Sequence, residues 1–328
     1  MIVVTGGAGF IGSCLLASLE KRGVRDLVVC DWLGGDEKWR NIAKRDLFDI
    51  VTPERLQEFL NDHARDVEMI FHLGAISSTT ATDGDLVVDR NLRFSQTVWQ
   101  WCVAHGVRFV YASSAATYGD GASGFDDVAS VGGLAHYQPL NLYGWSKHAF
   151  DRQIARSLES GRPRPPQWAG LKFFNVYGPN EYHKGGQQSV VAHLYPKIAA
   201  GEPARLFKSG HPDYADGGQL RDFIWVGDTV DVMLWLLDTP AASGLFNVGT
   251  GQARSFEDLA KAVFTASGRE EAIEYFEMPD QLRSTYQYFT QARVERLRAA
   301  GYTRSFTSLE DGVATYVRDF LAAADPYL

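Results

Sequence analysis

The first 22 residues hold an apolar run, a glycine-rich turn and a helical pattern, in that order. Residues 1–4 predict a short buried strand, and residues 13–22 predict a helix. In the turn between them, Gly6 allows a tight bend, Gly9 lets the backbone approach a pyrophosphate, and Gly12 lets helix and strand pack closely. A pyrophosphate would then lie at the positive end of the helix. The arrangement predicts a dinucleotide-binding turn, although the spacing is G-x-x-G-x-x-G rather than G-x-G-x-x-G.

A second apolar run, residues 27–30, ends at Asp31. An acidic residue about twenty positions after such a turn usually binds the adenosine ribose of NAD, although Asp31 could also cap a helix or turn. Lys38 and Arg40 follow closely and could meet the 2′-phosphate of NADP. The choice between NAD and NADP is therefore open.

Apolar runs alternate with helical patterns through the first half of the chain. Further strands are expected at 69–73, 107–112 and 170–174, with helices at 91–102 and 143–158. This alternation predicts the α/β class, with a Rossmann-type doubly wound parallel sheet and right-handed crossovers. In such a sheet, the loops that follow the strands face the ligand.

The alternation loosens after residue 174, where polar residues and glycines become frequent. We expect residues 1–174, with 222–249 returning to them, to form the dinucleotide-binding domain. Residues 175–221 and 250–328 are expected to form a smaller C-terminal α/β domain that covers the substrate.

Tyr143 and Lys147 lie four residues apart in an expected helix, so their side chains share one face about a turn apart. We expect the lysine ammonium to lower the pKa of the phenol, which lets Tyr143 exchange a proton with a substrate hydroxyl. Ser114, after a strand, could hydrogen-bond the same substrate oxygen or could cap the next turn. His72, at another strand end, is interpreted as a packed histidine rather than a catalytic one.

The overall composition excludes several other classes of protein. A net charge of −8 argues against nucleic-acid or acidic-membrane partners. Cys14, Cys30 and Cys102 lie in apolar runs and are interpreted as reduced, packed thiols. No metal-binding motif of the C-x-x-C or H-E-x-x-H kind is present, so no metal is expected. The N-terminal apolar run is too short for a signal peptide or a membrane span, so we expect a cytoplasmic protein.

Four motifs resemble the extended short-chain dehydrogenase/reductase superfamily: residues 6–12, Ser113-Ser114, Tyr143 with Lys147, and Arg221-Asp222-Phe223. The resemblance implies a Rossmann-type domain and a tightly bound nicotinamide cofactor, one per subunit. It also implies a nucleotide-sugar substrate in the C-terminal domain.

Within that superfamily, the chain most resembles the ADP-L-glycero-D-manno-heptose 6-epimerases of lipopolysaccharide core biosynthesis. The segments His183-Lys184-Gly185 and Tyr286-Gln287 are discriminating, because other members need not have them. The resemblance implies an isomerase that oxidises C6 of an ADP-heptose to a ketone and then reduces it on the opposite face. It also suggests a homo-oligomer, often of five subunits.

The resemblance assigns roles to individual residues. Tyr143 and Lys184 would be the two acid/base groups, Lys147 would tune Tyr143 and bind the nicotinamide ribose, and Ser114 completes the expected catalytic set. The cofactor, NADP with NAD possible, is expected to contact Gly6, Gly9, Phe10, Ile11, Gly12, Asp31, Trp32, Lys38, Leu73, Gly74, Ala75, Ser77, Asn91, Tyr143, Lys147 and Val176. The substrate is expected to contact Ser114, Asn175, Lys184, Gly186, His193, Phe207, Arg221 and Tyr286. Arg221 would bind the diphosphate, because a guanidinium presents forked donors.

Some positions depart from that family's pattern, and they leave alternatives open. Trp32 and Leu73 replace a usual asparagine and glutamate, which bears on the choice between NADP and NAD. Gly186 replaces a common serine, and residues 211–219 form a longer loop, which bears on the sugar. A UDP-hexose 4-epimerase is the alternative enzyme, and a non-enzymatic cofactor-binding regulator is the alternative of another class. A 4,6-dehydratase fits less well, because Ala115-Ala116 stands where those enzymes usually have Asp-Glu.

Overall fold

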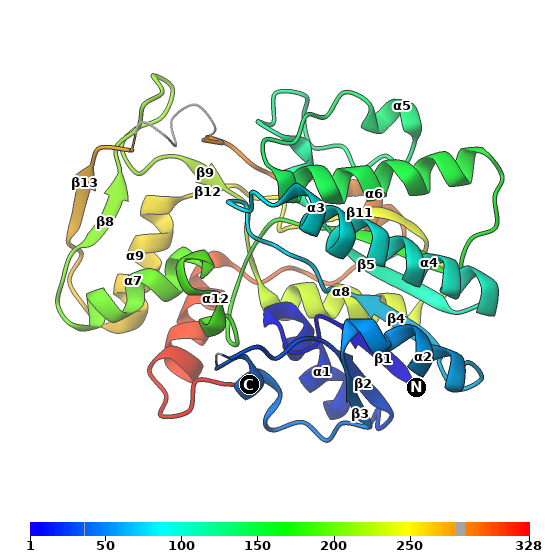
Figure 1. Cartoon of the computed structure of the whole chain (residues 1–328). Coiled ribbons are helices and arrows are strands. Elements are labelled where there is room, and N and C mark those ends of the chain that lie inside the picture. The colour runs from blue at the N-terminus through cyan, green and yellow to red at the C-terminus, as the bar shows by residue number, and fades with distance from the viewer. Residues whose placement is uncertain (36, 280–285) are drawn as a thin grey trace.

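The computed structural model describes residues 1–35, 37–279 and 286–328. Its main sheet has seven strands in the order β11-β6-β5-β4-β1-β2-β3, and every adjacent pair is parallel (Figure 1). The strands are β1 (Ile2–Thr5), β2 (Leu27–Cys30), β3 (Asp49–Val51), β4 (Met69–His72), β5 (Arg108–Ser114), β6 (Trp168–Phe173) and β11 (Gly244–Val248). The predicted doubly wound parallel sheet is confirmed. The strand order reverses between β1 and β4, and ligands bind at such a reversal.

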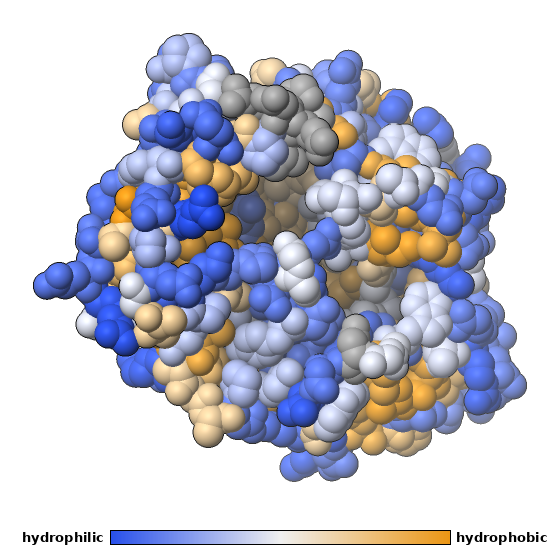
Figure 2. All heavy atoms as spheres, turned by 60° about the vertical axis from the view of Figure 1, so that its left-hand side comes forward, coloured by the Kyte–Doolittle hydropathy of each residue, from blue (hydrophilic) through white to orange (hydrophobic). Residues whose placement is uncertain are grey.

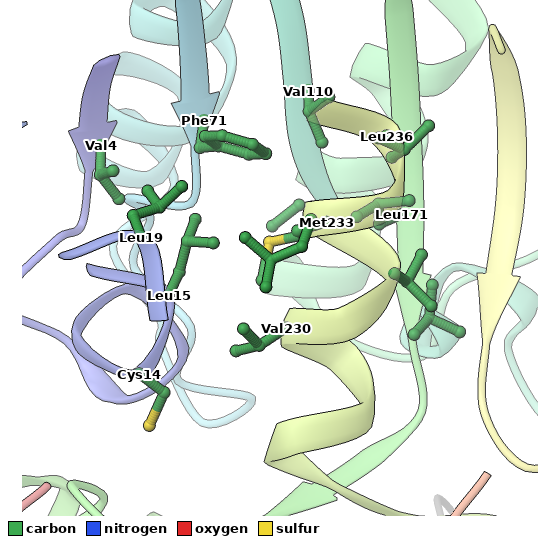
Figure 3. Packing of buried hydrophobic residues seen from close by; sticks show 14 of the residues in the cluster. Val4, Cys14, Leu15, Leu19, Phe71, Val110, Leu171, Val230, Met233 and Leu236 are labelled. Carbon is green, nitrogen blue, oxygen red and sulfur yellow. The ribbon is translucent and has the colours of Figure 1, made fainter. Parts of the chain in front are cut away.

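Helices cover both faces of this sheet, which explains why its central strands are apolar at nearly every position. Successive residues point to opposite faces, so Val4 packs in one core and Val3 in the other. The first core contains α1 (Phe10–Lys21), α8 (Val226–Asp238) and α11 (Glu295–Ala299), and Figure 3 shows α1 and α8 side chains meeting beneath the strands. The second contains α2 (Leu56–Asp62), α4 (Phe94–His105) and α6 (Leu142–Glu159).

Short elements connect the strands and helices of the main sheet. They are η1 (Glu37–Ile42), η2 (Pro53–Arg55), α3 (Gly84–Val87), η3 (Val88–Arg93), η4 (Ala115–Tyr118) and α5 (Val131–Leu134). The helix expected at 91–102 begins at Phe94 and follows the π-helical turn η3. Strand β3 was not predicted, because its residues are partly polar and largely exposed at the sheet edge.

A smaller cluster of elements lies on the left in Figure 1 and has its own apolar core, which includes Leu206, Val263 and Tyr316. It contains α7 (Val190–Ala199), β8 (Ala204–Phe207), α9 (Phe256–Ser267), β13 (Ile273–Phe276), α12 (Leu309–Tyr316) and η6 (Val317–Leu321). The linking elements are β7 (Asn175–Tyr177), η5 (Tyr182–Gln187), β9 (Leu220–Arg221), β10 (Phe223–Trp225) and β12 (Arg254–Ser255). Ser255 precedes α9 as its N-cap and forms a capping box with Asp258.

Two smaller expectations concern the whole chain. Cys14, Cys30 and Cys102 are free and buried, which confirms packed thiols. Within the described ranges, no helix is both long and apolar enough to cross a bilayer.

Candidate functional site: a cavity at the strand ends

A cavity of about 870 Å³ opens at the carboxyl ends of the central strands. Figure 2 shows the surface of the molecule hollowed near the centre of that view. The lining comes from the turn before α1, the loops after β2, β4, β5 and β6, the start of α6, and the η5 segment. The cavity therefore joins the main sheet to the smaller cluster, at the place predicted for a ligand.

The glycine-rich turn forms one wall of this cavity, and Gly6, Gly9 and Gly12 all line it. A Cβ atom on Gly12 would lie 2.2 Å from the Gly6 carbonyl oxygen, so only glycine lets α1 approach the turn this closely. Gly9 precedes α1 without a side-chain cap, and the first turn of the helix has no acidic residue. Backbone N–H groups at this helix start are therefore available to an anion such as a pyrophosphate.

Asp31 lies beside that turn and is buried. Its carboxylate accepts hydrogen bonds from the backbone N–H groups of Ala8 (3.0 Å) and Trp32 (2.8 Å), and it forms an ion pair with Lys38 (2.6 Å). Asp31 thus braces the turn as well as lining the cavity. Because Lys38 neutralises it, the carboxylate does not by itself exclude a 2′-phosphate.

Arg90 also lines this end of the cavity, although the sequence reasoning did not identify it. Its guanidinium lies 4.4 Å from the centre of the exposed Trp32 ring. Glu54 accepts hydrogen bonds from both Trp32 Nε1 and Arg90 Nη1, each at 3.1 Å. Arg40 instead pairs with Glu37 and does not line the cavity.

His72 is a packed histidine, as predicted, because both ring nitrogens have partners within the core. Ser95 Oγ donates to the carbonyl of Asn91 (2.5 Å), so it must accept from His72 Nε2 (2.8 Å). His72 Nδ1 then accepts from Thr5 Oγ1 (2.8 Å), which itself accepts from Gly74 N–H (3.1 Å). This chain fixes one tautomer and joins β1, β4 and the helix that follows. Burial lowers the pKa of His72 to about 3, so the ring is neutral.

Asn91 lies behind the cavity rather than in its lining. Its side-chain amide pairs with both backbone groups of Ile76, at 2.8 and 2.9 Å. It also donates to Ser146 Oγ (3.0 Å), which donates to the carbonyl of Tyr143 (2.7 Å). Asn91 therefore holds the loop after β4 against the start of α6.

Ser114, Tyr143 and Lys147 all line the cavity, so the structure brings the predicted catalytic residues together. Asn141 caps α6 by accepting from Gly144 N–H (2.8 Å). A Cβ on Gly144 would lie 2.6 Å from the Ala116 carbonyl oxygen, so glycine is needed for α6 to approach η4, the turn after β5. Ser114 Oγ accepts from Ala116 N–H (3.1 Å), which leaves its own hydrogen free to donate. Ser114 thus caps the turn after β5 and faces the cavity.

The electrostatics of this group differ in part from the expectation. Burial raises the pKa of Tyr143, against the lowering expected from Lys147, and a hydrogen bond from Ser114 acts in the lowering direction. Lys147 is only 3% exposed, and burial lowers its pKa from 10.5 to about 8. Burial thus disfavours both the charged lysine and the phenolate, and only a charged lysine can stabilise a phenolate.

Lys184 faces the same cavity from η5, with its ammonium 5.2 Å from the centre of the Phe10 ring. Burial lowers its pKa, while the nearby Glu181 acts in the opposite direction. Glu181 is fully buried and accepts hydrogen bonds from Gly178 N–H (3.3 Å), Tyr316 Oη (3.0 Å), and the backbone and side chain of Ser189. This carboxylate joins the two ends of the loop that carries Lys184.

Most of the other predicted contact residues also line the cavity: Phe10, Ile11, Trp32, Lys38, Leu73, Gly74, Ala75, Ser77, Asn175, Val176 and Gly186. Four predicted substrate residues do not. Arg221 is buried, with its guanidinium 5.2 Å from the Tyr286 ring and 5.6 Å from the ring of Phe256, which does line the cavity. Phe207 packs on Tyr286 at 6.3 Å, and His193 is exposed on α7. Arg221, Phe207 and Tyr286 form a cluster adjoining the cavity through Phe256.

The donor set suits a dinucleotide better than a metal. Within the described ranges, no group of three or more histidine, cysteine or acidic side chains could hold a metal ion. The uncapped helix start, the closely packed glycine turn, the partly buried Tyr143 and the buried Lys147 fit a pyrophosphate, its ribose and a redox ring. Fold and cavity together define a Rossmann-type protein with a nicotinamide dinucleotide site.

Comparison with known proteins agrees with this class. The sequence pattern of the NAD dependent epimerase/dehydratase family matches residues 2–249, and the chain belongs to that family. An ADP-L-glycero-D-manno-heptose-6-epimerase of Nitratidesulfovibrio vulgaris (strain DP4) is 50% identical over 100% of both chains.

Two solved structures share the fold at lower identity. The ADP-L-glycero-D-manno-heptose-6-epimerase of Helicobacter pylori has a TM-score of 0.76 and 27% identity, covering 97% of this chain and 95% of that one. The UDP-glucose 4-epimerase of Thermus thermophilus, in complex with NAD, has a TM-score of 0.75 and 26% identity, covering 98% and 99%.

Proposed function

We propose that this chain is a nucleotide-sugar isomerase that interconverts ADP-D-glycero-D-manno-heptose and ADP-L-glycero-D-manno-heptose. The observation that carries the proposal is the 50% identity to a heptose-6-epimerase over the full length of both chains. The match spans the whole chain, so it is not confined to the cofactor-binding half. The product would serve the inner core of lipopolysaccharide.

The reaction needs a hydride acceptor and proton relays on two sides of the reacting carbon. A bound nicotinamide supplies the reversible hydride acceptor. Tyr143 would take the proton of the C6 hydroxyl as the ketone forms, with Ser114 hydrogen-bonding the same oxygen. When the ketone has turned over, Lys184 would return a proton to the oxygen, because it faces the cavity from a different segment. Its lowered pKa suits a group that gives up and regains a proton.

We propose NADP as the cofactor, tightly bound with one per subunit, and NAD as the second choice. The Asp31–Lys38 ion pair of 2.6 Å supports this order, because the lysine cancels the charge that would repel a 2′-phosphate. Arg90 adds a second cation at the same end of the cavity. The pyrophosphate would lie on the glycine wall before α1.

The sugar would contact the cavity residues Ser114, Asn175, Lys184 and Gly186. The diphosphate would bind Arg221, and the remaining nucleotide would contact Phe207, Tyr286 and His193. We further propose that the protein is cytoplasmic and a homo-oligomer, and a mass measurement in solution would test the oligomeric state.

The proposal is tested with the protein as purified. Mass spectrometry of the released cofactor should find NADP. Incubation with either ADP-heptose, without added cofactor, should give a mixture of both C6 epimers. Absence of epimerisation at C6 with bound cofactor present would refute the heptose assignment.

A UDP-hexose 4-epimerase is the second candidate, supported by the similarity to the Thermus thermophilus enzyme over 98% of this chain. UDP-glucose and UDP-galactose belong in the same substrate panel. Turnover of these sugars without turnover of ADP-heptose would favour this second candidate.

A further inference from the structure

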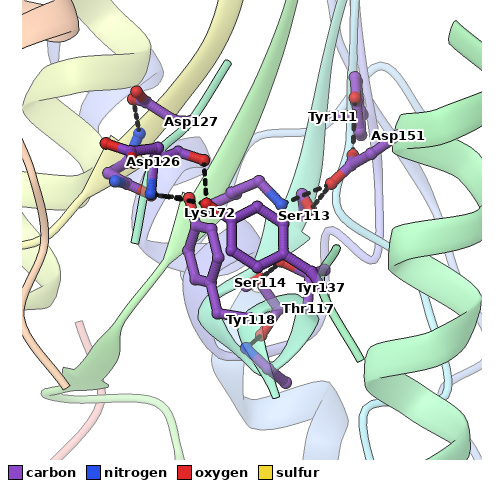
Figure 4. Close-up of polar contacts among 12 residues, drawn as sticks. Tyr111, Ser113, Ser114, Thr117, Tyr118, Asp126, Asp127, Tyr137, Asp151 and Lys172 are labelled. Atoms are coloured by element: carbon purple, nitrogen blue, oxygen red, sulfur yellow. Dashed lines mark hydrogen bonds and ion pairs between the residues drawn. The ribbon is translucent and has the colours of Figure 1, made fainter. Parts of the chain in front are cut away.

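A fully buried ion pair lies behind the catalytic end of β5. Lys172 Nζ on β6 is 2.8 Å from Asp151 Oδ2 on α6, and neither side chain is exposed to solvent (Figure 4). Tyr111 Oη (2.8 Å) and Ser113 Oγ (2.7 Å) donate to the same carboxylate. Isolated buried charges are costly, so the pair is stable only because these partners satisfy it.

The pair is connected to Ser114 through Thr117. Lys172 Nζ donates to Thr117 Oγ1 (2.6 Å), and Thr117 Oγ1 donates to the carbonyl oxygen of Ser114 (2.8 Å). The Tyr118 ring covers the ammonium, with its centre 4.7 Å away. The turn that aims the Ser114 hydroxyl at the cavity is therefore anchored to a buried charge.

The pair is also oriented with respect to α6. Asp151 lies four residues after Lys147 and eight after Tyr143, which places all three along one face of the helix. The negative end of the pair thus lies on the helix that carries Tyr143 and Lys147, and the positive end lies on β6, next to the turn that follows Ser114.

We propose that the Lys172–Asp151 pair is a positioning unit for the proposed epimerase: it anchors the turn that carries Ser114 and sets the charge behind Tyr143 and Lys147. The inference rests on the proposed function for its assay. It adds two residues, Asp151 and Lys172, that touch neither substrate nor cofactor but act through Ser114, Tyr143 and Lys147.

The electrostatic directions agree with this orientation. Asp151 contributes to raising the pKa of Tyr143, after burial, and it opposes the burial that lowers the pKa of Lys147. Lys172 acts on other groups: it lowers the pKa values of Asp127 and His148, and Asp151 opposes its effect on His148.

Burial is the largest cause of the pKa shifts of the other titratable groups around the pair. The pKa values of Tyr111 and Tyr118 are raised by burial, and Asp151 adds to both shifts. Burial raises the pKa of Asp127 to about 6 and lowers that of His148 to about 4. Above about pH 7, we therefore expect a change at Asp151 to be felt mainly at Tyr143 and Lys147, where its effect is smaller than that of burial.

The first test removes the charge. Asp151→Asn alone leaves a buried cation, so the decisive variant is the double change Asp151→Asn with Lys172→Met, which leaves no unpaired charge. We expect the acid limb of the kcat–pH profile to move to lower pH by about 0.5–1 unit, because Tyr143 loses a neighbouring anion. If the double variant folds and binds cofactor but its acid limb does not move, the pair does not set the charge behind Tyr143 and Lys147.

The second test removes only the anchor. Thr117→Val keeps the shape and the ion pair but loses the hydroxyl between Lys172 and the Ser114 carbonyl. We expect kcat to fall about tenfold at an unchanged KM and an unchanged pH profile, and Thr117→Ser to restore it. Equal kcat in the valine and serine variants would overturn the positioning part.

Tyr118→Phe is the matched control. It removes a buried hydrogen bond of 2.6 Å to Asn247 but keeps the ring over Lys172, so it should lower stability without moving the pH profile. Both comparisons use whichever nucleotide sugar the wild-type protein turns over. A wrong choice of sugar would therefore fail in the wild type, whereas a wrong inference would fail only in the variants.

Discussion

Gln187 Nε2 donates to Ser78 Oγ across 2.8 Å, which joins the loop that carries Lys184 to the loop after β4. Both loops contribute lining residues to the cavity. A second connection runs from Asn41 Nδ2 to His183 Nδ1 (3.1 Å), and the same nitrogen of Asn41 donates to the carbonyl of Ala8 in the glycine-rich turn (2.8 Å). The loop of residues 182–188 is thereby tied to both walls of the dinucleotide site.

The first prediction concerns cofactor retention. Gln187→Ala removes the tie to Ser78, and a hydrogen bond contributes about 1 kcal/mol net, so we expect cofactor release to be about fivefold faster. Release can be followed by displacement of the reduced, fluorescent cofactor. Gln57→Ala is the matched control. It removes an exposed hydrogen bond of 3.2 Å to Asn61 within α2, and neither residue lines the cavity. Equal release rates in both variants would show that the Gln187–Ser78 hydrogen bond does not help to retain the cofactor.

The second prediction concerns the proton relay. Tyr143→Phe keeps the ring but removes the hydroxyl, and we expect turnover to fall by about 10²–10⁴ while cofactor affinity stays within about twofold. Steady-state kinetics and cofactor titration measure the two effects separately. Tyr302→Phe serves as control, because the Tyr302 hydroxyl is buried and has no hydrogen-bond partner in the described structure. Undiminished turnover in Tyr143→Phe would exclude its catalytic role.

The third prediction separates the two acid/base groups. Lys184→Gln removes an ionisable side chain that faces the cavity, so the second proton transfer should slow while the first continues. We therefore expect epimer formation to fall at least about tenfold and the bound cofactor to accumulate in its reduced form, visible by absorbance. Lys197→Gln, an exposed position on α7, should leave both signals unchanged. If Lys184→Gln epimerises at the normal rate, Tyr143 serves both orientations.

The sequence predicted well those parts of the site that are contiguous in the chain. The glycine-rich turn and the Tyr143–Lys147 pair depend on local geometry, namely a tight bend and one face of a helix, and both line the cavity. Spacing alone could not find Arg90 or Phe256, because they reach the cavity only through crossovers of the fold. The residues around Arg90 and Phe256 in the sequence therefore do not indicate that these side chains reach the cavity.

Electrostatics was the other limit of the sequence reasoning. The expected lowering of the Tyr143 pKa assumed a charged lysine beside a solvated phenol. Burial acts on both groups and reverses the net effect on the phenol. Burial depends on how β5, β6 and α6 pack together, which pairwise spacing does not contain.

The fourth prediction concerns acid stability. His72 has its pKa lowered from 6.5 to about 3, so between these values the unfolded chain binds a proton that the folded chain does not. Stability should therefore fall as pH drops through this window, by up to about 1.4 kcal/mol per pH unit from this group. Urea unfolding from pH 7.5 to 4.5 should show a shallower loss in His72→Gln than in the wild type. His105→Gln, at an exposed position, should keep the wild-type slope.

The fifth prediction concerns cofactor choice, and it follows from the ion pair between Asp31 and Lys38 at 2.6 Å. Lys38→Ala removes a cation and also leaves the buried Asp31 carboxylate unpaired beside the adenosine end of the cavity. Both changes disfavour a 2′-phosphate, so the ratio of NADP to NAD affinity should fall by about tenfold or more, equivalent to about 1.4 kcal/mol. Calorimetric titration with each cofactor measures the ratio directly. Lys261→Ala, which breaks a surface pair with Glu257, is the control and should not change it. A constant ratio in Lys38→Ala would mean that Lys38 does not face the 2′ position, and the proposed preference for NADP would then have to rest on Arg90.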